Sequence, residues 1–416
     1  MTGILYHFLI RCLGVSIRVA ALFSVKARQW CAGRKNWLAL MTKQRGAAPG
    51  PLVWFHCASL GEFEQGRPVI EAFRRDHPGH KILLSFFSPS GYEIRKNYQG
   101  ADYIYYLPLD TKGNARRFLD IWKPQLAIFV KYEYWFNYIR AMEERGIPVV
   151  VVSAIFRPGQ HFFRWYGRWS RRQLGKVSWF FVQNRDSLEL LNGIDIQNAS
   201  VSGDTRFDRV ALISQRPQAF PQLQGLSDKT PVLVAGSTWP DDEDLLLHLF
   251  RNSGTEMHML IAPHEITASG IDRLLREFGS TAVLFSSLRG LETFPRDKRV
   301  LIVDRIGRLS QLYQFATLAY VGGGFGKGIH NILEAATFGA PVFFGPAYRR
   351  FAEAVDLVER GGAFPVSDKQ VLLQGVQNLL SEPARLQQAS RVCSSYVEDN
   401  KGGTEKIMAS LKKFID

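Results

Sequence analysis

Residues 56–69 read His-Cys-Ala-Ser-Leu-Gly-Glu-Phe-Glu-Gln-Gly-Arg-Pro-Val. They continue an apolar run that starts at Leu52, interrupt it at Ser-Leu-Gly, and resume as a helical pattern with Glu62 in its first turn. The active sites of parallel sheets usually lie just beyond the carboxyl ends of strands. The stretch therefore predicts a strand, a tight turn and a helix, with Glu62 at the edge of the sheet where a site is expected.

Outward from this stretch, apolar runs alternate with amphipathic segments along most of the chain. The candidate strands are 52–58, 81–87, 103–107, 126–132, 148–155, 179–183 and 199–203, then 231–237, 257–262, 282–285, 300–303, 318–322 and 341–344. Continuous apolar strands separated by helices form parallel sheets that are covered on both faces. We therefore expect an α/β protein with two doubly wound, Rossmann-like domains facing a cleft, which suits a transferase with two substrates.

The length and composition agree with two domains. The chain has 416 residues, of which 46% are hydrophobic, so it can bury two ordinary cores. A polar stretch rich in Gln, Pro and Ser, residues 214–230, interrupts the strand-helix pattern and is predicted to be a linker. The expected segments are a membrane anchor at 1–25, an N-terminal domain at 26–213 and a C-terminal domain at 231–416, whose last helix could pack back on the N-terminal domain.

The N-terminal segment is strongly basic and partly apolar. Eight Lys and Arg residues precede Glu62, the first acidic residue, and the formal net charge is +14. This charge indicates an anionic partner: nucleic acid, phospholipid or a phosphorylated substrate. Residues 3–23 are mostly apolar but include His7, Arg11 and Arg18. We favour an amphipathic or obliquely inserted anchor over a spanning or a buried helix, on the cytoplasmic side of the membrane, and expect its deletion to leave both domains folded.

The cysteines do not suggest a metal or disulfide framework. Cys12, Cys31, Cys57 and Cys393 are scattered, with no C-x-x-C motif and no neighbouring pair of histidines. The spacing predicts neither a zinc site nor disulfides, so a reducing compartment is expected.

Residues 320–336 form the richest stretch of the second half, with five glycines between 322 and 328 followed by Asn331 and Glu334. Glycines allow close approach to an anion, and the next helix would offer free N–H groups and its positive dipole end to a phosphate. The acidic residue, Glu334, follows the glycines too closely for the dinucleotide-binding fingerprint of a dehydrogenase. Asn331 and Glu334 could instead form a structural helix cap.

Glu133 ends another candidate parallel strand, so two carboxylates are expected at the same edge of the first sheet. Glu62 alone could merely complement a helix dipole.

A second basic block, Arg157 to Lys176, contains six cations and five aromatic residues with no acid. This block is either a solvated helix face or a surface for phosphate-bearing acyl chains.

Several motifs, in order and over nearly the whole chain, resemble those of the 3-deoxy-D-manno-octulosonic acid (Kdo) transferases of lipopolysaccharide assembly, which have the GT-B fold. The matching motifs are His56-x-Ala58-Ser59-x-Gly61-Glu62, Glu133-x-Trp135-x-Asn137, Gly236-Ser237-Thr238-Trp239 with Glu243, Gly322-Gly323-Gly324-Phe325 with His330-Asn331-x-x-Glu334, and Phe338-Gly339-Ala340-Pro341-Val342 with Gly345-Pro346. The first and fourth are the most specific.

The resemblance implies CMP-Kdo as donor, a lipid A precursor of the lipid IVA type as acceptor, an anchor at the inner membrane, and no nucleic acid partner. It implies that Glu62 is the base and that the C-terminal domain holds CMP. The expected acceptor contacts are Ser59, Gly61, Glu133, Arg157 and Arg164. The expected donor contacts are Arg206, Ser237, Thr238, His264, Gly323, Gly324, Phe325, Asn331 and Glu334, the last on the ribose.

Some positions depart from the family pattern. Many relatives have Pro-Arg-His where this chain has Pro263-His264, which removes one expected phosphate contact, and Arg206 stands where lysine is frequent. Lys131 has no assigned role.

The chemistry implied by these roles needs a base. A sugar hydroxyl must lose its proton to a positioned carboxylate as it attacks. The departing CMP needs only charge stabilisation, and one displacement inverts the anomeric centre. Glu62 is expected to be ionised at neutral pH because a helix N-terminus favours its charged form. We expect no metal and no cofactor.

Two other functions stay open from sequence. Another GT-B nucleotide-sugar transferase acting on a membrane lipid would share the architecture, although it should lack the Ser-Leu-Gly-Glu turn. A non-enzymatic protein that binds nucleic acid or membranes would explain the charge but leave the carboxylates and the glycine turn unused.

Overall fold

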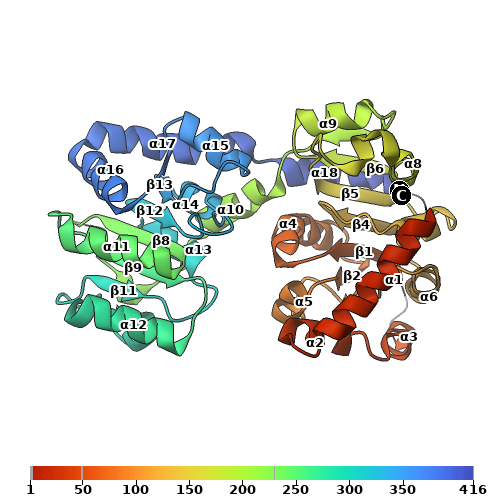
Figure 1. Ribbon diagram of the computed structural model, residues 1–416, viewed down its shortest axis with the longest axis horizontal. Coiled ribbons are helices and arrows are strands. Elements are labelled where there is room, and N and C mark those ends of the chain that lie inside the picture. Colours follow the sequence, from red (N-terminus) through yellow and green to blue (C-terminus); the bar gives the residue numbers. More distant parts are fainter. Residues whose placement is uncertain (1–2, 48–49, 229, 416) are drawn as a thin grey trace. The chain divides into compact units, whose positions relative to one another are not determined.

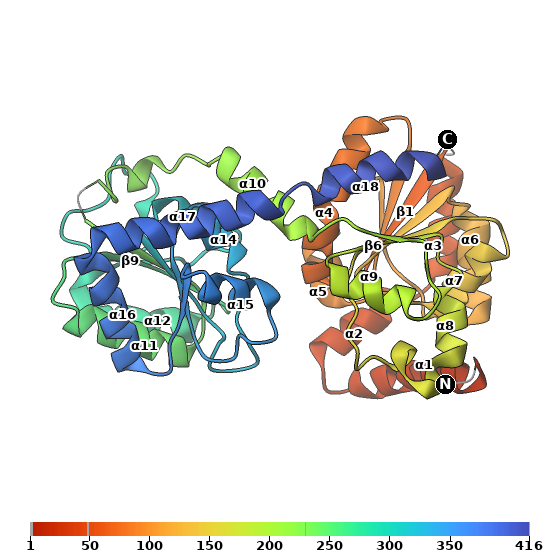
Figure 2. The ribbon, with the colours of Figure 1, turned by 90° about the horizontal axis from the view of Figure 1, so that it is seen from above.

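The computed structural model describes residues 3–47, 50–228 and 230–415, and the chain forms two compact units. The N-terminal unit comprises Met1–Arg209 and Lys401–Asp416, and the C-terminal unit comprises Val210–Asn400. Each unit has a seven-stranded parallel sheet with helices on both faces (Figures 1 and 2). The predicted linker, 214–230, lies within the C-terminal unit, where its apolar residues Phe220, Leu223 and Leu226 are buried.

The sheet of the N-terminal unit has the strand order β3-β2-β1-β4-β5-β6-β7. Its strands are β1 (Leu52–Cys57), β2 (Lys81–Phe86), β3 (Tyr103–Tyr106), β4 (Leu126–Val130), β5 (Val149–Ala154), β6 (Trp179–Val182) and β7 (Ala199–Val201). Its helices are α1 (Gly3–Ala20), α2 (Val25–Ala32), α3 (Trp37–Ala47), α4 (Leu60–Asp76), α5 (Pro89–Arg95), α6 (Lys112–Trp122), α7 (Phe136–Glu143), α8 (Arg168–Leu174), α9 (Arg185–Asn192) and α18 (Gly403–Leu411).

Most strand residues are apolar and buried, because helices cover both faces of the sheet. Along β1, Trp54 points into the core formed with α6 and α7, whereas Phe55 points into the core formed with α4. This alternation follows from the two-residue period of a strand. Helix α18 returns to the N-terminal unit after the C-terminal unit is complete, and its Ile407 and Leu411 are buried in the core with α4.

The sheet of the C-terminal unit has the strand order β10-β11-β9-β8-β12-β13-β14. Its strands are β8 (Val232–Thr238), β9 (His258–Pro263), β10 (Ala282–Leu284), β11 (Val300–Ile302), β12 (Leu318–Val321), β13 (Val342–Phe344) and β14 (Ala363–Pro365). The helices are α10 (Thr205–Gln215), which enters from the N-terminal unit, α11 (Pro240–Asn252), α12 (Ala268–Phe278), α13 (Leu309–Leu312), α14 (Leu333–Ala336), α15 (Ala352–Glu359), α16 (Lys369–Ser381) and α17 (Pro383–Asn400).

Every predicted strand is present within a residue or two of its expected bounds, and the two-sheet fold is confirmed. The sequence missed β14, a three-residue strand that pairs with β13 at the edge of the sheet and ends at Pro365. Its sequence, Ala-Phe-Pro, ends on a proline, a residue that in sheets is confined to edge strands, strand starts and bulges and so argues against a strand. The helix expected after the glycine stretch is also shorter than predicted, since α14 covers only Leu333–Ala336.

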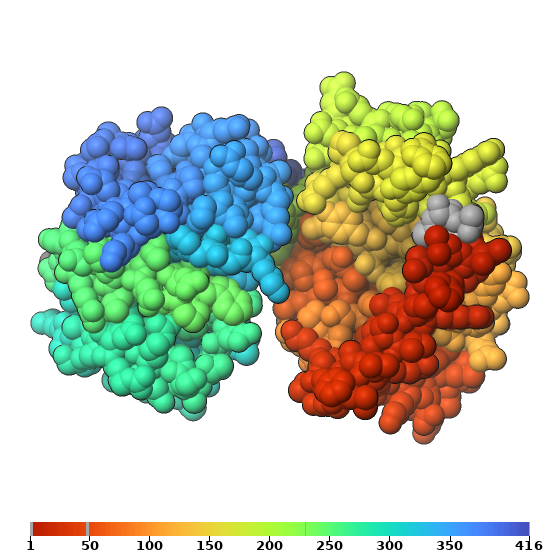
Figure 3. Space-filling view, viewed as in Figure 1, coloured from red at the N-terminus to blue at the C-terminus, as the bar shows by residue number. Residues whose placement is uncertain are grey.

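Helix α1 lies along the surface of the N-terminal unit, as the red segment of Figure 3 shows. Its buried residues are Tyr6, Ile10 and Gly14, which lie one turn apart on a single narrow face. The rest of the helix is exposed and largely apolar, with Ile4 at 84% and Phe8 at 61% exposure. By length and composition, α1 is the one helix among the described residues that could cross a membrane. The predicted anchor is therefore also a packed element of the unit.

Candidate active site

The two carboxylates predicted for the first sheet follow neighbouring strands. Strand β1 pairs with β4 in the middle of the sheet, where the strand order reverses direction. In open parallel sheets, such a switch point leaves a crevice at the carboxyl ends of the two strands, where ligands bind. Glu62 lies in the first turn of α4, which follows β1, and Glu133 lies in the loop after β4. The sequence correctly placed both at this edge.

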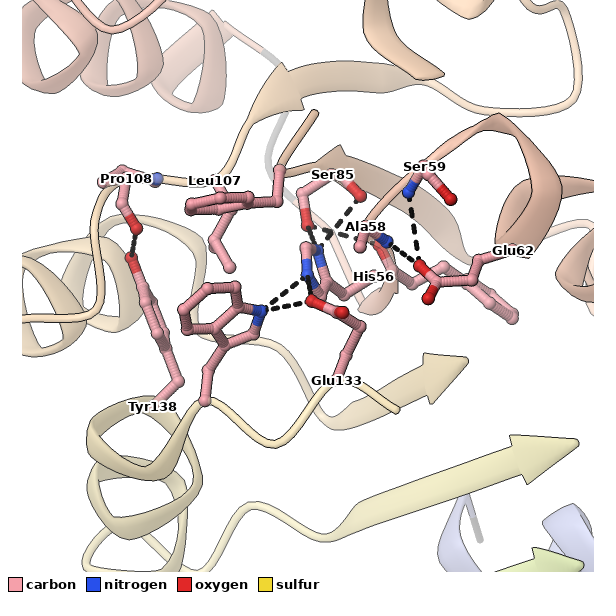
Figure 4. A network of polar contacts seen from close by, with 12 residues as sticks. His56, Ala58, Ser59, Glu62, Ser85, Leu107, Pro108, Glu133 and Tyr138 are labelled. Carbon is pink, nitrogen blue, oxygen red and sulfur yellow. Dashed lines mark hydrogen bonds and ion pairs between the residues drawn. The ribbon is translucent and has the colours of Figure 1, made fainter. Parts of the chain in front are cut away.

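The carboxyl group of Glu62 is held by backbone donors. Its Oε2 accepts hydrogen bonds from the N–H groups of Ala58 (2.5 Å) and Ser59 (3.2 Å), as drawn in Figure 4. Burial and, next in size, the charge of Glu133 nevertheless raise the pKa of Glu62 to about 8, against the lowering effect of these N–H groups and of Lys131. The expectation that Glu62 is ionised at neutral pH is therefore wrong. The helix N-terminus acts as predicted, but desolvation outweighs it.

Glu133 belongs to a buried network that includes His56. The Nε2 atom of His56 lies 3.0 Å from Oε2 of Glu133, and the Trp135 indole N–H donates to the same oxygen (2.5 Å; Figure 4). On the other side of the ring, Nδ1 lies 2.8 Å from Oγ and 3.1 Å from the carbonyl oxygen of Ser85. His56 and Ser85 are both fully buried. Glu133 is thus fixed in orientation by two side chains.

The backbone before Glu133 is strained. Lys131 has a φ of +67°, a left-handed conformation that non-glycine residues rarely adopt and that often marks functional sites. Its positive charge lowers the pKa of Glu62, so its side chain acts on the site electrostatically. Lys131 is a contributor that the sequence left without a role.

The other predicted acceptor residues lie at different distances from this network. Ser59 precedes α4 and donates its N–H to Glu62, while Gly61 is exposed in the first turn of that helix. Arg157 is exposed, and its charge lowers the pKa of Tyr132, which places it near the Glu133 loop. Arg164 is also exposed, but its side chain makes no hydrogen bond or ion pair with any described residue.

Arg206, predicted to contact the donor, belongs to the N-terminal unit. Its guanidinium bonds Oδ2 of the buried Asp204, with Nε at 2.8 Å and Nη2 at 2.7 Å. The charge of Arg206 also lowers the pKa of Tyr132. The structure therefore groups Arg206 with the Glu133 edge of the first sheet.

The C-terminal unit has its own switch point, between β8 and β12. Ser237, near the end of β8, has a left-handed φ of +54°, and the Thr238 hydroxyl donates to Glu243 (2.9 Å). Asp242 joins the two turns, because its carboxylate accepts from the N–H groups of Trp239 (2.9 Å) and Gly323 (3.0 Å). Asp242 is 1% exposed and was not singled out from sequence.

The glycine turn after β12 is tightly packed. A Cβ on Gly324 would lie 2.5 Å from the backbone of Gly345, so this position must be glycine. The N–H of Gly323, a predicted donor contact, already bonds Asp242, whereas those of Gly324 and Phe325 have no partner among the described residues. These two N–H groups are therefore available to an anion.

Three rings stack beside this turn. His264, a predicted donor contact, lies between Trp239 (ring centroids 4.8 Å apart) and His330 (4.3 Å). Asn331 Nδ2 donates to Oε1 of Glu334 (3.2 Å), and Asn331 Oδ1 accepts from the N–H of Leu333 (3.3 Å), but the N-cap position of α14 is Ile332, so the predicted capping box is absent from this helix. Because α14 is a single turn, its dipole is small, and the predicted dipole contribution to phosphate binding is wrong.

Comparison with known proteins shows a similarity to one family. Residues 33–209 match the family model of "3-Deoxy-D-manno-octulosonic-acid transferase (kdotransferase)". The chain is 27% identical over 376 residues to a 3-deoxy-D-manno-octulosonic acid transferase of Chlamydophila psittaci, covering 88% of this chain and 86% of that protein. It is 27% identical over 337 residues to the corresponding protein of Aquifex aeolicus, covering 79% and 86%. The chain is thus similar to Kdo transferases over most of its length.

The fold has solved relatives outside this Kdo transferase family. A UDP-GlcNAc 2-epimerase from Neisseria meningitidis, solved with UDP-GlcNAc, superposes with a TM-score of 0.60 at 18% identity, covering 88% of this chain and 100% of that chain. This likeness supports the GT-B architecture. The Kdo transferase family model spans Glu62, Glu133 and Arg206, whereas the glycine turn lies outside the matched residues.

The site also contains residues whose roles the sequence did not reveal. His56, Trp135 and His330 stood inside quoted motifs, but nothing in their spacing showed that His56 and Trp135 would meet at Glu133 or that His330 would stack on His264. The sequence feature that could have pointed to these residues is a polar or aromatic side chain at or just after the end of an otherwise apolar strand.

Proposed function

We propose that this chain transfers Kdo from CMP-Kdo to a lipid A precursor of the lipid IVA type, with inversion at the anomeric carbon. The observation that carries the proposal is the half-buried Glu62 side chain, with its raised pKa, at the switch point of the first sheet, beside Glu133. Similarity to Kdo transferases supports the transferred sugar. The proposal goes beyond this support in naming CMP as the donor nucleotide and a lipid A precursor as the acceptor.

Glu62 acts as the general base in this proposal. A base is most effective when its pKa lies near the working pH, because the ionised form is then both available and able to take a proton. A pKa of about 8 meets this condition, whereas an ordinary glutamate would be a weaker proton acceptor. The acceptor hydroxyl transfers its proton to Glu62 as its oxygen attacks the anomeric carbon. Glu133, fixed by His56 and Trp135, orients the acceptor.

The C-terminal unit holds the donor. The N–H groups of Gly324 and Phe325 are free to bind the phosphate of CMP, and Ser237 and Thr238 lie at the adjoining strand end. Glu334 accepts the ribose hydroxyls. The leaving phosphate is acidic, so it departs as an anion stabilised by these donors and needs no proton. We propose that this step needs no metal ion.

The acceptor is reached at the cytoplasmic face of the inner membrane. The exposed apolar side chains of α1, with Arg11 and Arg18 on the same helix, suit the boundary between lipid headgroups and acyl chains. Arg157 and Arg164 provide cations for the phosphates of the lipid.

The decisive experiment uses the purified full-length chain in detergent or vesicles with a lipid A precursor and freshly generated CMP-Kdo. Mass spectrometry of the lipid should show the added mass of one or more Kdo units. A lipid left unmodified by CMP-Kdo but glycosylated by a UDP-sugar would replace this proposal with the other GT-B transferase.

A further inference from the structure

The loop that carries Glu133 ends on the first turn of α7, and this turn is capped from outside the helix. The first N–H groups of a helix have no partners within it. Here the N–H of Phe136 donates to Oη of Tyr6 (3.3 Å), and those of Asn137 and Tyr138 donate to the two carboxylate oxygens of Asp110, both at 3.1 Å. Trp135, at the N-cap position, supplies no side-chain cap.

Tyr6 and Asp110 are themselves bonded. The hydroxyl of Tyr6 donates to Oδ2 of Asp110, and both side chains are buried. The Tyr6 ring packs against Phe136 (centroids 5.2 Å apart) and Trp169 (5.4 Å). Asp110 is further fixed because its carbonyl oxygen accepts from the Asn137 side chain (2.7 Å). Helix α1 therefore takes part directly in the cap of α7.

The inner and outer faces of α1 have different environments. Ile4 and Phe8 stand two residues from Tyr6, about 200° away around the helix. They are exposed, whereas Tyr6 is 8% exposed. The helix whose outer face suits a lipid surface thus holds, on its inner face, the segment that follows Glu133.

We infer that Tyr6 is a positioning residue for the Glu133 loop, so that α1 supports catalysis as well as membrane binding. The inference follows from a continuous chain of contacts: Tyr6 binds Asp110, both cap α7, and α7 begins directly after Trp135, which donates to Glu133. Its catalytic consequence rests on the function proposed above.

The test replaces Tyr6 by Phe, which removes the hydroxyl and keeps the ring. Tyr396→Phe is the matched control, because the Tyr396 hydroxyl donates to Asp356 (2.8 Å) and the side chain is 4% exposed, but it lies in the C-terminal unit and is not one of the proposed donor contacts. Both variants should lose a similar amount of thermal stability. Only Tyr6→Phe should lower kcat, by roughly tenfold, with the KM for CMP-Kdo unchanged within about twofold.

Hydrogen exchange gives a readout that does not need activity. In Tyr6→Phe the amides of residues 136–138 should exchange faster, while those of β1 and β4 keep their protection. Asp110→Asn, which keeps the side-chain shape, should show the same local loss. Vesicle binding should be unchanged in both variants.

Equal kcat and equal exchange at 136–138 in Tyr6→Phe and Tyr396→Phe would overturn the inference. If the wild-type chain forms no Kdo product, the proposed function fails, but the exchange experiment still decides whether Tyr6 holds the loop. If Tyr6→Phe does not fold, the exchange pattern of Asp110→Asn decides.

Discussion

Replacing Glu62 by Gln should have opposite effects on activity and on stability. Gln keeps the shape of the side chain and one oxygen that can accept from the N–H groups of Ala58 and Ser59. It cannot accept the proton of the acceptor hydroxyl, so turnover should fall about a hundredfold or more, the usual size for the loss of a general base. CMP affinity should stay close to that of the wild type, because the proposed donor site lies in the other unit.

The stability effect follows from the raised pKa. The unfolded chain releases the Glu62 proton near pH 4.5, whereas the folded protein keeps it up to about pH 8. Between these values the folded state binds more protons, so wild-type stability should fall as the pH rises. At about 1.4 kcal/mol per pH unit, this loss is at most about 5 kcal/mol. The Gln side chain of Glu62→Gln does not ionise, so the variant does not lose stability in this way as the pH rises. Its Tm should therefore exceed that of the wild type at pH 8 to 9, and the two Tm values should converge near pH 4.

The assay measures product formation and Tm over the same pH range, about pH 5 to pH 9. Wild-type kcat/KM should rise with pH and level off near pH 8, as the base ionises. Glu133→Gln is the control. Its neutral side chain removes a charge that raises the pKa of Glu62, so the rise in activity should move to lower pH. Because Glu133 only orients the acceptor, the loss of turnover should be smaller.

Two results would refute this reasoning. Near-normal turnover in Glu62→Gln would make Glu133 the better candidate for the base. Parallel Tm curves for Glu62→Gln and wild type across the pH range would show that the Glu62 carboxyl group is not destabilised by burial.

Three further predictions concern the donor, the membrane and metals. Glu334→Gln should weaken CMP binding in calorimetry with little change in Tm; a lower Tm with unchanged affinity would indicate a structural cap. Changing the exposed Ile4 and Phe8 to Ser should reduce flotation with anionic vesicles at constant Tm, whereas deletion of 3–23 also removes the buried Tyr6 and should lower the Tm. Product formation should be unaffected by EDTA; loss of activity that added Mg²⁺ restores would contradict metal-independent transfer.

The two sheets could be predicted from sequence because their strands are apolar on both faces and are separated by amphipathic helices. The same pattern located Glu62 and Glu133, since the carboxyl ends of parallel strands share one edge of the sheet. Neither conclusion required knowing the strand order. The switch point between β1 and β4 then explains why these two carboxylates, rather than others in the sheet, lie close enough to interact.

The protonation of Glu62 could not be predicted in the same way. The local sequence shows only the helix N-terminus, which lowers the pKa of Glu62, whereas the larger opposing effect comes from burial in the folded unit. Long-range contacts were hidden for a similar reason. Tyr6 and Asp110 are 104 residues apart, and Tyr6 lies in a segment whose apolar character indicated only a membrane anchor. The face of α1 that packs on the unit and the face that suits a membrane are both apolar, so the sequence does not distinguish them.

The surroundings of the two carboxylates indicate why Glu62, and not Glu133, is proposed as the base. The tautomer of His56 with its hydrogen on Nε2 satisfies both sides of the ring: Nδ1 can accept from the Ser85 hydroxyl, 2.8 Å away, and Nε2 can donate to Oε2 of Glu133, 3.0 Å away. Glu133 Oε2 also accepts from the Trp135 indole. Both carboxylates accept hydrogen bonds from two donors, but burial raises the pKa of Glu62, so Glu62 is the better proton acceptor in the proposed reaction.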